Sequence, residues 1–228
     1  MAADSEAYKG LIDYIEKQIV EGKITIGDRL PSERELAAML GISRGAVRIG
    51  LNVLEAIGVV NNRPGSGNYI AGQFDHNLVQ LMTIMYTLDD MSTRDICGFR
   101  YAAELQAIMR APQNITYTHR RLLGSYLGIM LSSENPDERS YGDNMIHRTI
   151  VEASGNRLLI ANYLALNGLM EKFVRHVREG VLESEPQEYE RFQQTHARLV
   201  EAVCNKNYEK AKEALDEHQA FLERYIDD

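Results

Sequence analysis

Residues 27–60, GDRLPSERELAAMLGISRGAVRIGLNVLEAIGVV, decide the fold of the first part of the chain. Ser32 is followed three residues later by Glu35, which is the pattern of a capping box at the start of a helix. Gly41 is placed to end that helix, and Ser43 is placed to cap the next one. Two helices joined by a turn of about three to four residues are typical of a helix-turn-helix.

The segments on either side complete a small domain. Residues 8–21 repeat apolar side chains with the period of an amphipathic helix, and residues 23–26 are short and β-branched, so we expect a strand there. Residues 59–62 and 68–71 flank the sequence RPGSG, which indicates a β-hairpin with a longer loop. A helix-turn-helix followed by a hairpin predicts a winged helix-turn-helix, whose second helix can enter the major groove of DNA.

The charge distribution agrees with DNA binding by this first part. The net charge of the whole chain, −8, argues at first against a nucleic-acid partner. Residues 1–73 carry a net charge of only −1, however, and residues 29–63 carry +2 with five arginines. Arg44 and Arg48 are four residues apart on one helix face, and arginine can form two hydrogen bonds with guanine. We predict that they contact DNA; the alternative is an ordinary solvated helix face.

Residues 8–71 resemble the DNA-binding domain of the GntR family of bacterial regulators, through the run quoted above and the sequence RPGSGNYI at residues 63–70. The residues to which this resemblance assigns DNA contact are Arg34, Arg44, Arg48 and Gly67. The chain departs from the family's pattern at Ile49-Gly50, where Glu-Ala is usual. Because glycine inside a helix costs about 1 kcal/mol relative to alanine, this helix is expected to be either less rigid or more closely packed.

After residue 73 glycine and proline become sparse, and the apolar periods predict an all-α bundle. The fold class is therefore mainly α. Beyond a linker helix at residues 74–88, the helices are expected at residues 92–111, 115–133, 137–154, 157–181, 187–204 and 207–226. The chain divides into a winged helix-turn-helix domain at residues 1–73, a linker at 74–90 and an all-α domain at 91–228.

Four side chains of the all-α part fall on inward faces. Asp143 and His147 are four residues apart and share a helix face. His196 and His218 each continue an apolar stripe, and each lies 11 residues from the turn near Asn207, so antiparallel helices place them at the same height. Three imidazoles and a carboxylate suit a divalent first-row metal, whereas such groups are expensive to bury without partners. We predict a metal site; the alternative is four separately satisfied side chains.

Arg100 places a charge on an otherwise apolar helix face. Guanidinium binds carboxylate with two hydrogen bonds, so Arg100 is predicted to hold a carboxylate effector; the alternative is an ion pair with Glu104. A divalent metal with one aspartate and three neutral imidazoles keeps a charge of +1, and Arg100 raises the expected charge of the site to +2. Sugar acids, hydroxy acids and dicarboxylates all suit such a site.

Residues 78–228 resemble the FCD domain, the ligand-binding half of the FadR subfamily of GntR regulators. The resemblance is carried by RYAAE at residues 100–104, by DNMIH at 143–147 with ASGN at 153–156, and by two later histidines. It maps the family's metal ligands onto Asp143, His147, His196 and His218. The metal that it implies is a divalent transition metal, namely zinc, with nickel or manganese as alternatives. Ile146 stands where the family usually has phenylalanine, which should alter the shape of the site rather than ligation.

Other features exclude several classes of protein. There is no run of about 18 apolar residues, which excludes a membrane span, and the N-terminus lacks the order of a secretion signal, so we expect a cytoplasmic protein. Cys97 and Cys204 share no short motif, which argues against a disulfide framework or a cysteine zinc site.

The function predicted from these features is that of a transcriptional regulator and not an enzyme. We expect a homodimeric repressor that binds double-stranded operator DNA and is released by a small organic carboxylate held at the metal. Two alternatives use the same Asp and His residues. One is a metal-dependent hydrolase, which would leave the winged segment unexplained, and the other is a regulator that senses the metal itself.

Overall fold

The computed structural model describes residues 2–72, 75–89, 91–164, 166 and 186–226. Contacts divide the chain into two compact units, Met1–Gln80 and Leu81–Asp228. The division falls inside helix α4 (Asp75–Leu88), the helix expected as a linker. The domain limits expected from the sequence stay a prediction.

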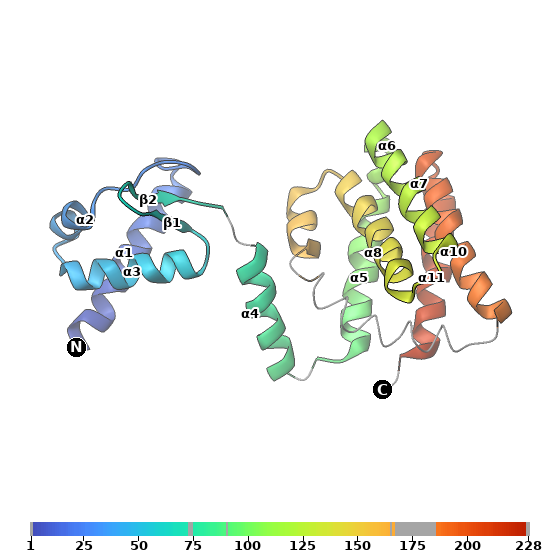
Figure 1. Ribbon diagram of the computed structural model, residues 1–228, viewed down its shortest axis with the longest axis horizontal. Coiled ribbons are helices and arrows are strands. Elements are labelled where there is room, and N and C mark those ends of the chain that lie inside the picture. The colour runs from blue at the N-terminus through green and yellow to red at the C-terminus, as the bar shows by residue number, and fades with distance from the viewer. Residues whose placement is uncertain (1, 73–74, 90, 165, 167–185, 227–228) are drawn as a thin grey trace. The chain divides into compact units, whose positions relative to one another are not determined.

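Unit 1 is a winged helix-turn-helix, as expected. Its elements are α1 (Ala2–Val20), α2 (Glu33–Leu40), α3 (Arg44–Ala56), β1 (Val60–Arg63) and β2 (Gly67–Ile70) (Figure 1). The two strands pair antiparallel, with Arg63 opposite Gly67. The chain bends by 112° between α2 and α3. No single helix in the described ranges has the length and apolar content of a membrane span, and α2 and α3 reach them only when counted together.

The helix ends follow from the local sequence. The backbone N–H of Glu35 donates to Ser32 Oγ at 3.3 Å, and the N–H of Ser32 donates to Glu35 Oε2 at 2.8 Å, which confirms the capping box. Gly41 ends α2 with a φ of 66°, a left-handed conformation that glycine adopts without strain. Ser43 Oγ accepts the N–H of Ala46 at 3.0 Å and starts α3.

The strand expected at residues 23–26 is wrong. The Asp28 carboxylate accepts the backbone N–H of Thr25 at 2.7 Å, and this side-chain bond makes a turn in place of a strand. The extended pairing occurs slightly later in the chain, where Arg29 forms an isolated antiparallel bridge with Tyr69 of the wing.

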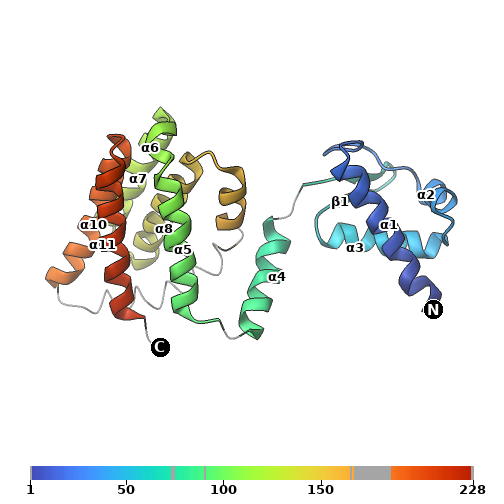
Figure 2. The ribbon, with the colours of Figure 1, turned by 180° about the vertical axis from the view of Figure 1, so that it is seen from behind.

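The core of unit 1 joins the three helices to the wing, with α1 crossing α3 (Figure 2). Its buried side chains are Leu11, Ile15, Leu30, Leu36, Val47, Leu51, Leu54, Val60 and Ile70. A Cβ atom at Gly50 would lie 2.8 Å from Leu11 Cδ2 and 3.2 Å from the Tyr8 carbonyl oxygen. Of the two explanations for this glycine, closer packing is therefore the one that the structure supports.

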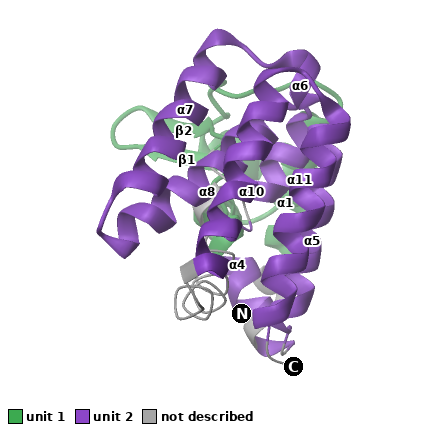
Figure 3. Cartoon of the chain, turned by 90° about the vertical axis from the view of Figure 1, so that its right-hand side faces the viewer, with its two compact units in different colours: residues 1–80 green, residues 81–228 purple. Residues whose placement is uncertain are grey.

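Unit 2 is a helical bundle (purple in Figure 3). Its elements are α5 (Thr93–Ile108), α6 (Ala111–Asn114), α7 (Tyr117–Ser132), α8 (Pro136–Ala153), α10 (Pro186–Cys204), α11 (Tyr208–Leu222) and the short 3-10 helix η1 (Glu223–Tyr225). The helix expected at residues 157–181 is present over 157–164, and residues 167–181 lie outside the described residues. Pro112 lies in the first turn of α6, where its missing N–H loses no hydrogen bond.

The helices of unit 2 pack so that four of them meet around one interior. Helices α7 and α8 form one pair, and α10 and α11 form another. Helix α5 packs against α8 and α11, while α10 also contacts α8. Residues on α5, α8, α10 and α11 that face inward are thereby brought together.

Replacing Gly142 with alanine is expected to lower the free energy of unfolding of unit 2. A Cβ atom there would lie 2.8 Å from the Tyr126 carbonyl oxygen and 2.9 Å from the Met130 backbone nitrogen, so α7 and α8 would have to separate. Overpacking of this kind costs about 1–3 kcal/mol, which exceeds the gain of about 1 kcal/mol from helix propensity. Equilibrium urea unfolding in the presence of a chelator measures the change.

Gly124→Ala is the matched control for this substitution. Gly124 lies inside α7, and nothing stands within 4 Å of a Cβ atom built on it. This variant should therefore be as stable as the wild type or more stable. Equal stabilisation by both substitutions would contradict the close approach of α7 and α8.

Candidate nucleic-acid interface and candidate metal centre

Three arginines predicted to contact DNA are exposed on the helix-turn-helix. Arg44 is the first residue of α3 and Arg48 follows one turn later, while Arg34 lies in the first turn of α2. Arg48 Nη2 lies 3.1 Å from Glu33 Oε2; the Arg48 side chain is exposed and that of Glu33 partly exposed, so this surface ion pair adds little stability. The start of α3 thus presents two guanidinium groups where a recognition helix needs donors.

The wing brings two further arginines beside the predicted Gly67. Gly67 has a φ of 109°, and a Cβ atom there would lie 3.4 Å from Arg29 Nε. The Arg63 guanidinium lies 4.3 Å from the centre of the Tyr69 ring. Arg29, Arg63 and Gly67 all line a groove of about 990 Å³ between the start of α2 and the wing. Arg29 and Arg63 contribute to the +2 charge of residues 29–63, but no sequence motif assigns them a role.

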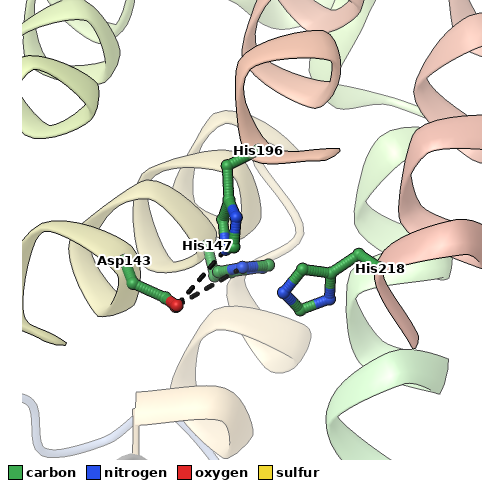
Figure 4. Close-up of side chains that lie close together, drawn as sticks. All are labelled: Asp143, His147, His196 and His218. Carbon is green, nitrogen blue, oxygen red and sulfur yellow. Dashed lines mark ion pairs between the residues drawn. The ribbon is translucent and has the colours of Figure 1, made fainter. Parts of the chain in front are cut away.

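The four residues predicted as metal ligands lie together inside unit 2 (Figure 4). Asp143 and His147 come from α8, His196 from α10 and His218 from α11. One ligand atom from each lies within 4.8 Å of every other, and all four side chains are buried. The rings of His196 and His218 are 4.5 Å apart, as equal distances from the α10–α11 turn require. Their role as ligands stays a prediction.

Two nitrogen atoms in this cluster lack hydrogen-bond partners. Among the described residues, His147 Nε2 and His196 Nε2 are the only buried side-chain nitrogen or oxygen atoms in that condition. Leaving a buried polar atom unsatisfied costs about 1–3 kcal/mol. Both atoms lie near the Asp143 carboxylate, His147 Nε2 at 3.6 Å from Oδ1 and His196 Nε2 at 3.3 Å from Oδ2. A divalent cation at this position would satisfy both nitrogens and the carboxylate together.

The protonation states also suit a metal. Burial lowers the pKa of His147, and it lowers the pKa of His218 well below the usual histidine value. Imidazole must be neutral to donate its lone pair to a metal. The donor set of three imidazoles and one carboxylate therefore fits a divalent transition metal.

Arg100 lies beside this cluster and is paired with Glu104. It is 3% exposed, with Nε 2.7 Å from Glu104 Oε1 and Nη2 3.4 Å from Asp143 Oδ1. The ion pair weighed as the alternative role of Arg100 is thus present, and the guanidinium also reaches a predicted metal ligand. Its role in binding an effector stays a prediction.

Glu104 changes the expected charge of the site. Burial alone would raise its pKa, but the nearby His147 and Arg100 outweigh burial and lower the pKa to about 2, so the carboxylate is ionised. The expected charge of +2 left this carboxylate out. With Glu104 included, a site that holds a divalent metal and Arg100 carries +1 and not +2.

Two family models match the chain. The model described as "Bacterial regulatory proteins, gntR family" matches residues 7–70, and the model of the FCD domain matches residues 95–221. The chain belongs to the GntR family of bacterial regulatory proteins. It is therefore a DNA-binding transcriptional regulator of the GntR/FCD type, and regulators of this type bind operator DNA and typically form dimers.

Relatives align with the chain over most of its length. The putative L-lactate dehydrogenase operon regulatory protein of Escherichia coli is 28% identical over 92% of this chain and 82% of the relative. The Glc operon transcriptional activator of Escherichia coli is 26% identical over 94% and 86%, and LutR of Bacillus subtilis is 27% identical over 90% and 94%. The solved structure of Streptococcus agalactiae GntR has the same fold, with a TM-score of 0.67 and 20% identity over 97% of this chain and 99% of that one.

Two residues beside the predicted metal ligands were missed or underestimated in the sequence. The sequence indicates Glu104 only as a partner of Arg100, four residues away on the same face of α5. The Tyr163 hydroxyl donates to Glu104 Oε1 at 2.9 Å, and no local pattern around residue 163 indicates this contact. Ile146, at the position where the family usually has phenylalanine, is fully buried in the core of unit 2.

Proposed function

We propose that this GntR regulator is a repressor whose operator binding is released by a small carboxylate bound at a divalent metal. The residues proposed to hold the metal are Asp143, His147, His196 and His218. The observation that carries the proposal is the pair of unsatisfied Nε2 atoms of His147 and His196, buried beside an aspartate and next to Arg100. Buried polar atoms in a purely structural core are nearly always hydrogen-bonded, so these two nitrogens favour a ligand that satisfies them.

The donor set narrows the metal to those that accept imidazole and carboxylate together. Zinc, nickel and manganese all bind such ligands. When bound, the metal supplies a Lewis-acid attraction for an oxygen atom of the effector. Arg100 supplies the second attraction, since a guanidinium binds carboxylate through two parallel N–H donors.

The charge of the loaded site favours an effector with one negative charge. With Glu104 ionised the site carries +1, which a monocarboxylate neutralises and a dicarboxylate overcompensates. Sugar acids and hydroxy acids are therefore favoured over dicarboxylates. The name of one relative, a regulator of an L-lactate dehydrogenase operon, also points to a hydroxy monocarboxylate.

Repression is proposed as the direction of control, with the regulator acting as a homodimer on a two-fold operator. One relative is named a transcriptional activator, so the direction needs its own measurement. The operator is first selected by the wild-type protein from a random pool of duplexes. A reporter gene behind that operator should be silent with the protein alone and active when the carboxylate effector is added. Expression that requires the protein together with the acid would overturn the repressor assignment.

Arg100→Ala is expected to abolish the response to the acid while metal and operator binding remain. An effector shifts operator affinity only by its different affinity for two conformations, usually about 1–3 kcal/mol or about 5–150-fold. Without the guanidinium the acid loses one of its two proposed attractions. Fluorescence anisotropy on a duplex selected by the wild-type protein from a random pool, with and without a panel of organic acids, measures the shift. Arg100→Lys should respond only partly, because an ammonium lacks the planar fork.

Arg198→Ala is the control. Arg198 lies on the exposed side of α10 and pairs with Glu217 of α11, so this variant should respond to the acid as the wild type does. An undiminished response in Arg100→Ala would leave Arg100 as a partner of Glu104 only. Operator affinity that follows the metal and ignores every acid would replace the carboxylate proposal with the metal-sensing alternative.

A further inference from the structure

Glu104 occupies the centre of a buried hydrogen-bond network beside the proposed metal ligands. It is 2% exposed and lies on α5. Its carboxylate meets three groups: Arg100 Nε lies 2.7 Å from Oε1, the Tyr163 hydroxyl lies 2.9 Å from Oε1, and His147 Nδ1 lies 2.7 Å from Oε2. The contact to His147 bears on the proposed metal site, because it engages Nδ1 and leaves Nε2 as the unsatisfied nitrogen of the ring.

An ionised carboxylate can only accept hydrogen bonds, so the imidazole nitrogen that faces it must carry the proton. A neutral imidazole has one N–H, and therefore a proton on Nδ1 of His147 leaves Nε2 with a free lone pair. Nε2 is the atom of His147 that lies 3.6 Å from Asp143 Oδ1 and lacks a partner. The ring thus presents a metal-binding nitrogen because of what its other nitrogen touches.

We propose that Glu104 is the positioning residue of the site, which holds His147 in the tautomer whose Nε2 faces the metal; this rests on the metal site of the proposed function. The outer partners of metal-bound histidines commonly have this effect. His196 has a comparable arrangement, since its Nδ1 lies 3.2 Å from the backbone carbonyl oxygen of Phe192. The partner of His147 differs from that of His196 because it is a side-chain carboxylate that also binds Arg100. This carboxylate therefore connects a proposed metal ligand to the residue proposed to bind the effector.

Glu104→Gln tests the proposal with little change of shape. If the amide oxygen keeps the bonds to Arg100 and Tyr163, its NH₂ group faces His147 Nδ1, which must then accept. The proton moves to Nε2, the nitrogen that should bind the metal. Affinity for zinc, measured by competition with a chelator of known affinity, should fall about 10–100-fold.

Two control variants separate this effect from general disturbance. Glu152→Gln is the same substitution on α8, at a carboxylate that accepts from Arg148 Nε at 2.8 Å and has no contact with the site. Tyr163→Phe removes a donor to Oε1 of Glu104 and leaves the contact between Oε2 and His147. Glu152→Gln should bind zinc as the wild type does, and Tyr163→Phe should lose much less zinc affinity than Glu104→Gln. A loss in Tyr163→Phe as large as that in Glu104→Gln would overturn the tautomer argument.

The tautomer itself is measured on the metal-free wild type, which needs no substitution. Long-range ¹H–¹⁵N correlation spectra at a pH well above the usual histidine value of about 6.5 should show the His147 proton on Nδ1. A proton on Nε2, or zinc binding by Glu104→Gln as tight as that by the wild type, would overturn the proposal. Failure of the wild type to bind any metal would instead contradict the proposed function, while the spectra would still decide the role of Glu104.

Discussion

His218→Ala and His196→Ala are expected to remove the single divalent ion that we expect each wild-type chain to hold. Each substitution deletes one of four ligand atoms that lie within 4.8 Å of one another, and each leaves an apolar gap in place of an imidazole. Elemental analysis after purification without chelator should give about one ion per wild-type chain and a small fraction of that in either variant.

The same loss should be visible in thermal stability. A metal that binds the folded state adds RT ln(1 + [L]/Kd), about 2.7 kcal/mol at a hundredfold excess over Kd. For a domain of this size that raises the melting temperature by about 5–10 °C. Chelation should remove the increment in the wild type and change nothing in His218→Ala.

His119→Ala provides the control for these measurements. His119 belongs to the capping interaction with Thr116 at the start of α7, outside the cluster. Its replacement should leave the metal content at one ion per chain. A wild-type protein that takes up no stoichiometric metal under any reconstitution would end the metal proposal, and full occupancy in His218→Ala would remove that residue from the ligand set.

The features that the sequence predicted correctly are those that depend on short-range chemistry. The capping box of Ser32 and Glu35 and the turn at Gly41 need only neighbouring residues, and their effect on the chain is independent of packing. The proximity of His196 and His218 followed from counting residues on both sides of one turn, because two adjacent helices rise equally per residue. These signals were sufficient to place the helix-turn-helix and most of the cluster.

The features that the sequence missed depend on local competition or on contacts between distant segments. The β-branched residues 23–26 favour a strand, but the Asp28 side chain binds the backbone there and makes a turn. The bond from Tyr163 to Glu104 joins helices far apart in the chain, and only packing reveals it. The charge of the site was miscounted for the same reason, since Glu104 counts only once it is known to be buried beside His147.

Replacing both Arg44 and Arg48 with alanine is expected to weaken operator binding without unfolding the protein. Both side chains are exposed, whereas the core of unit 1 is formed by Val47, Leu51 and Leu54 on the other face of α3. A base-reading arginine should cost about 1–3 kcal/mol and relax one position of the operator. If the arginine contacts a phosphate, its loss should instead reduce the steepness with which the logarithm of the binding constant falls with the logarithm of salt concentration, by about one unit. Anisotropy titrations at several salt concentrations separate these two effects.

Arg34→Ala should weaken binding through a lost contact to the DNA backbone, and its salt slope should fall accordingly. Lys17→Ala is the control, since Lys17 is an exposed cation on α1 with an ion pair to Glu21, outside the helix-turn-helix. Circular dichroism should give the same melting temperature for all these variants, because the two ion pairs lost, Arg48 with Glu33 and Lys17 with Glu21, lie at the surface and contribute little. Normal operator affinity in the Arg44 and Arg48 double variant would show that α3 does not bind DNA through this face. A loss equal in size to that of Lys17→Ala would reduce both arginines to contributors of general charge.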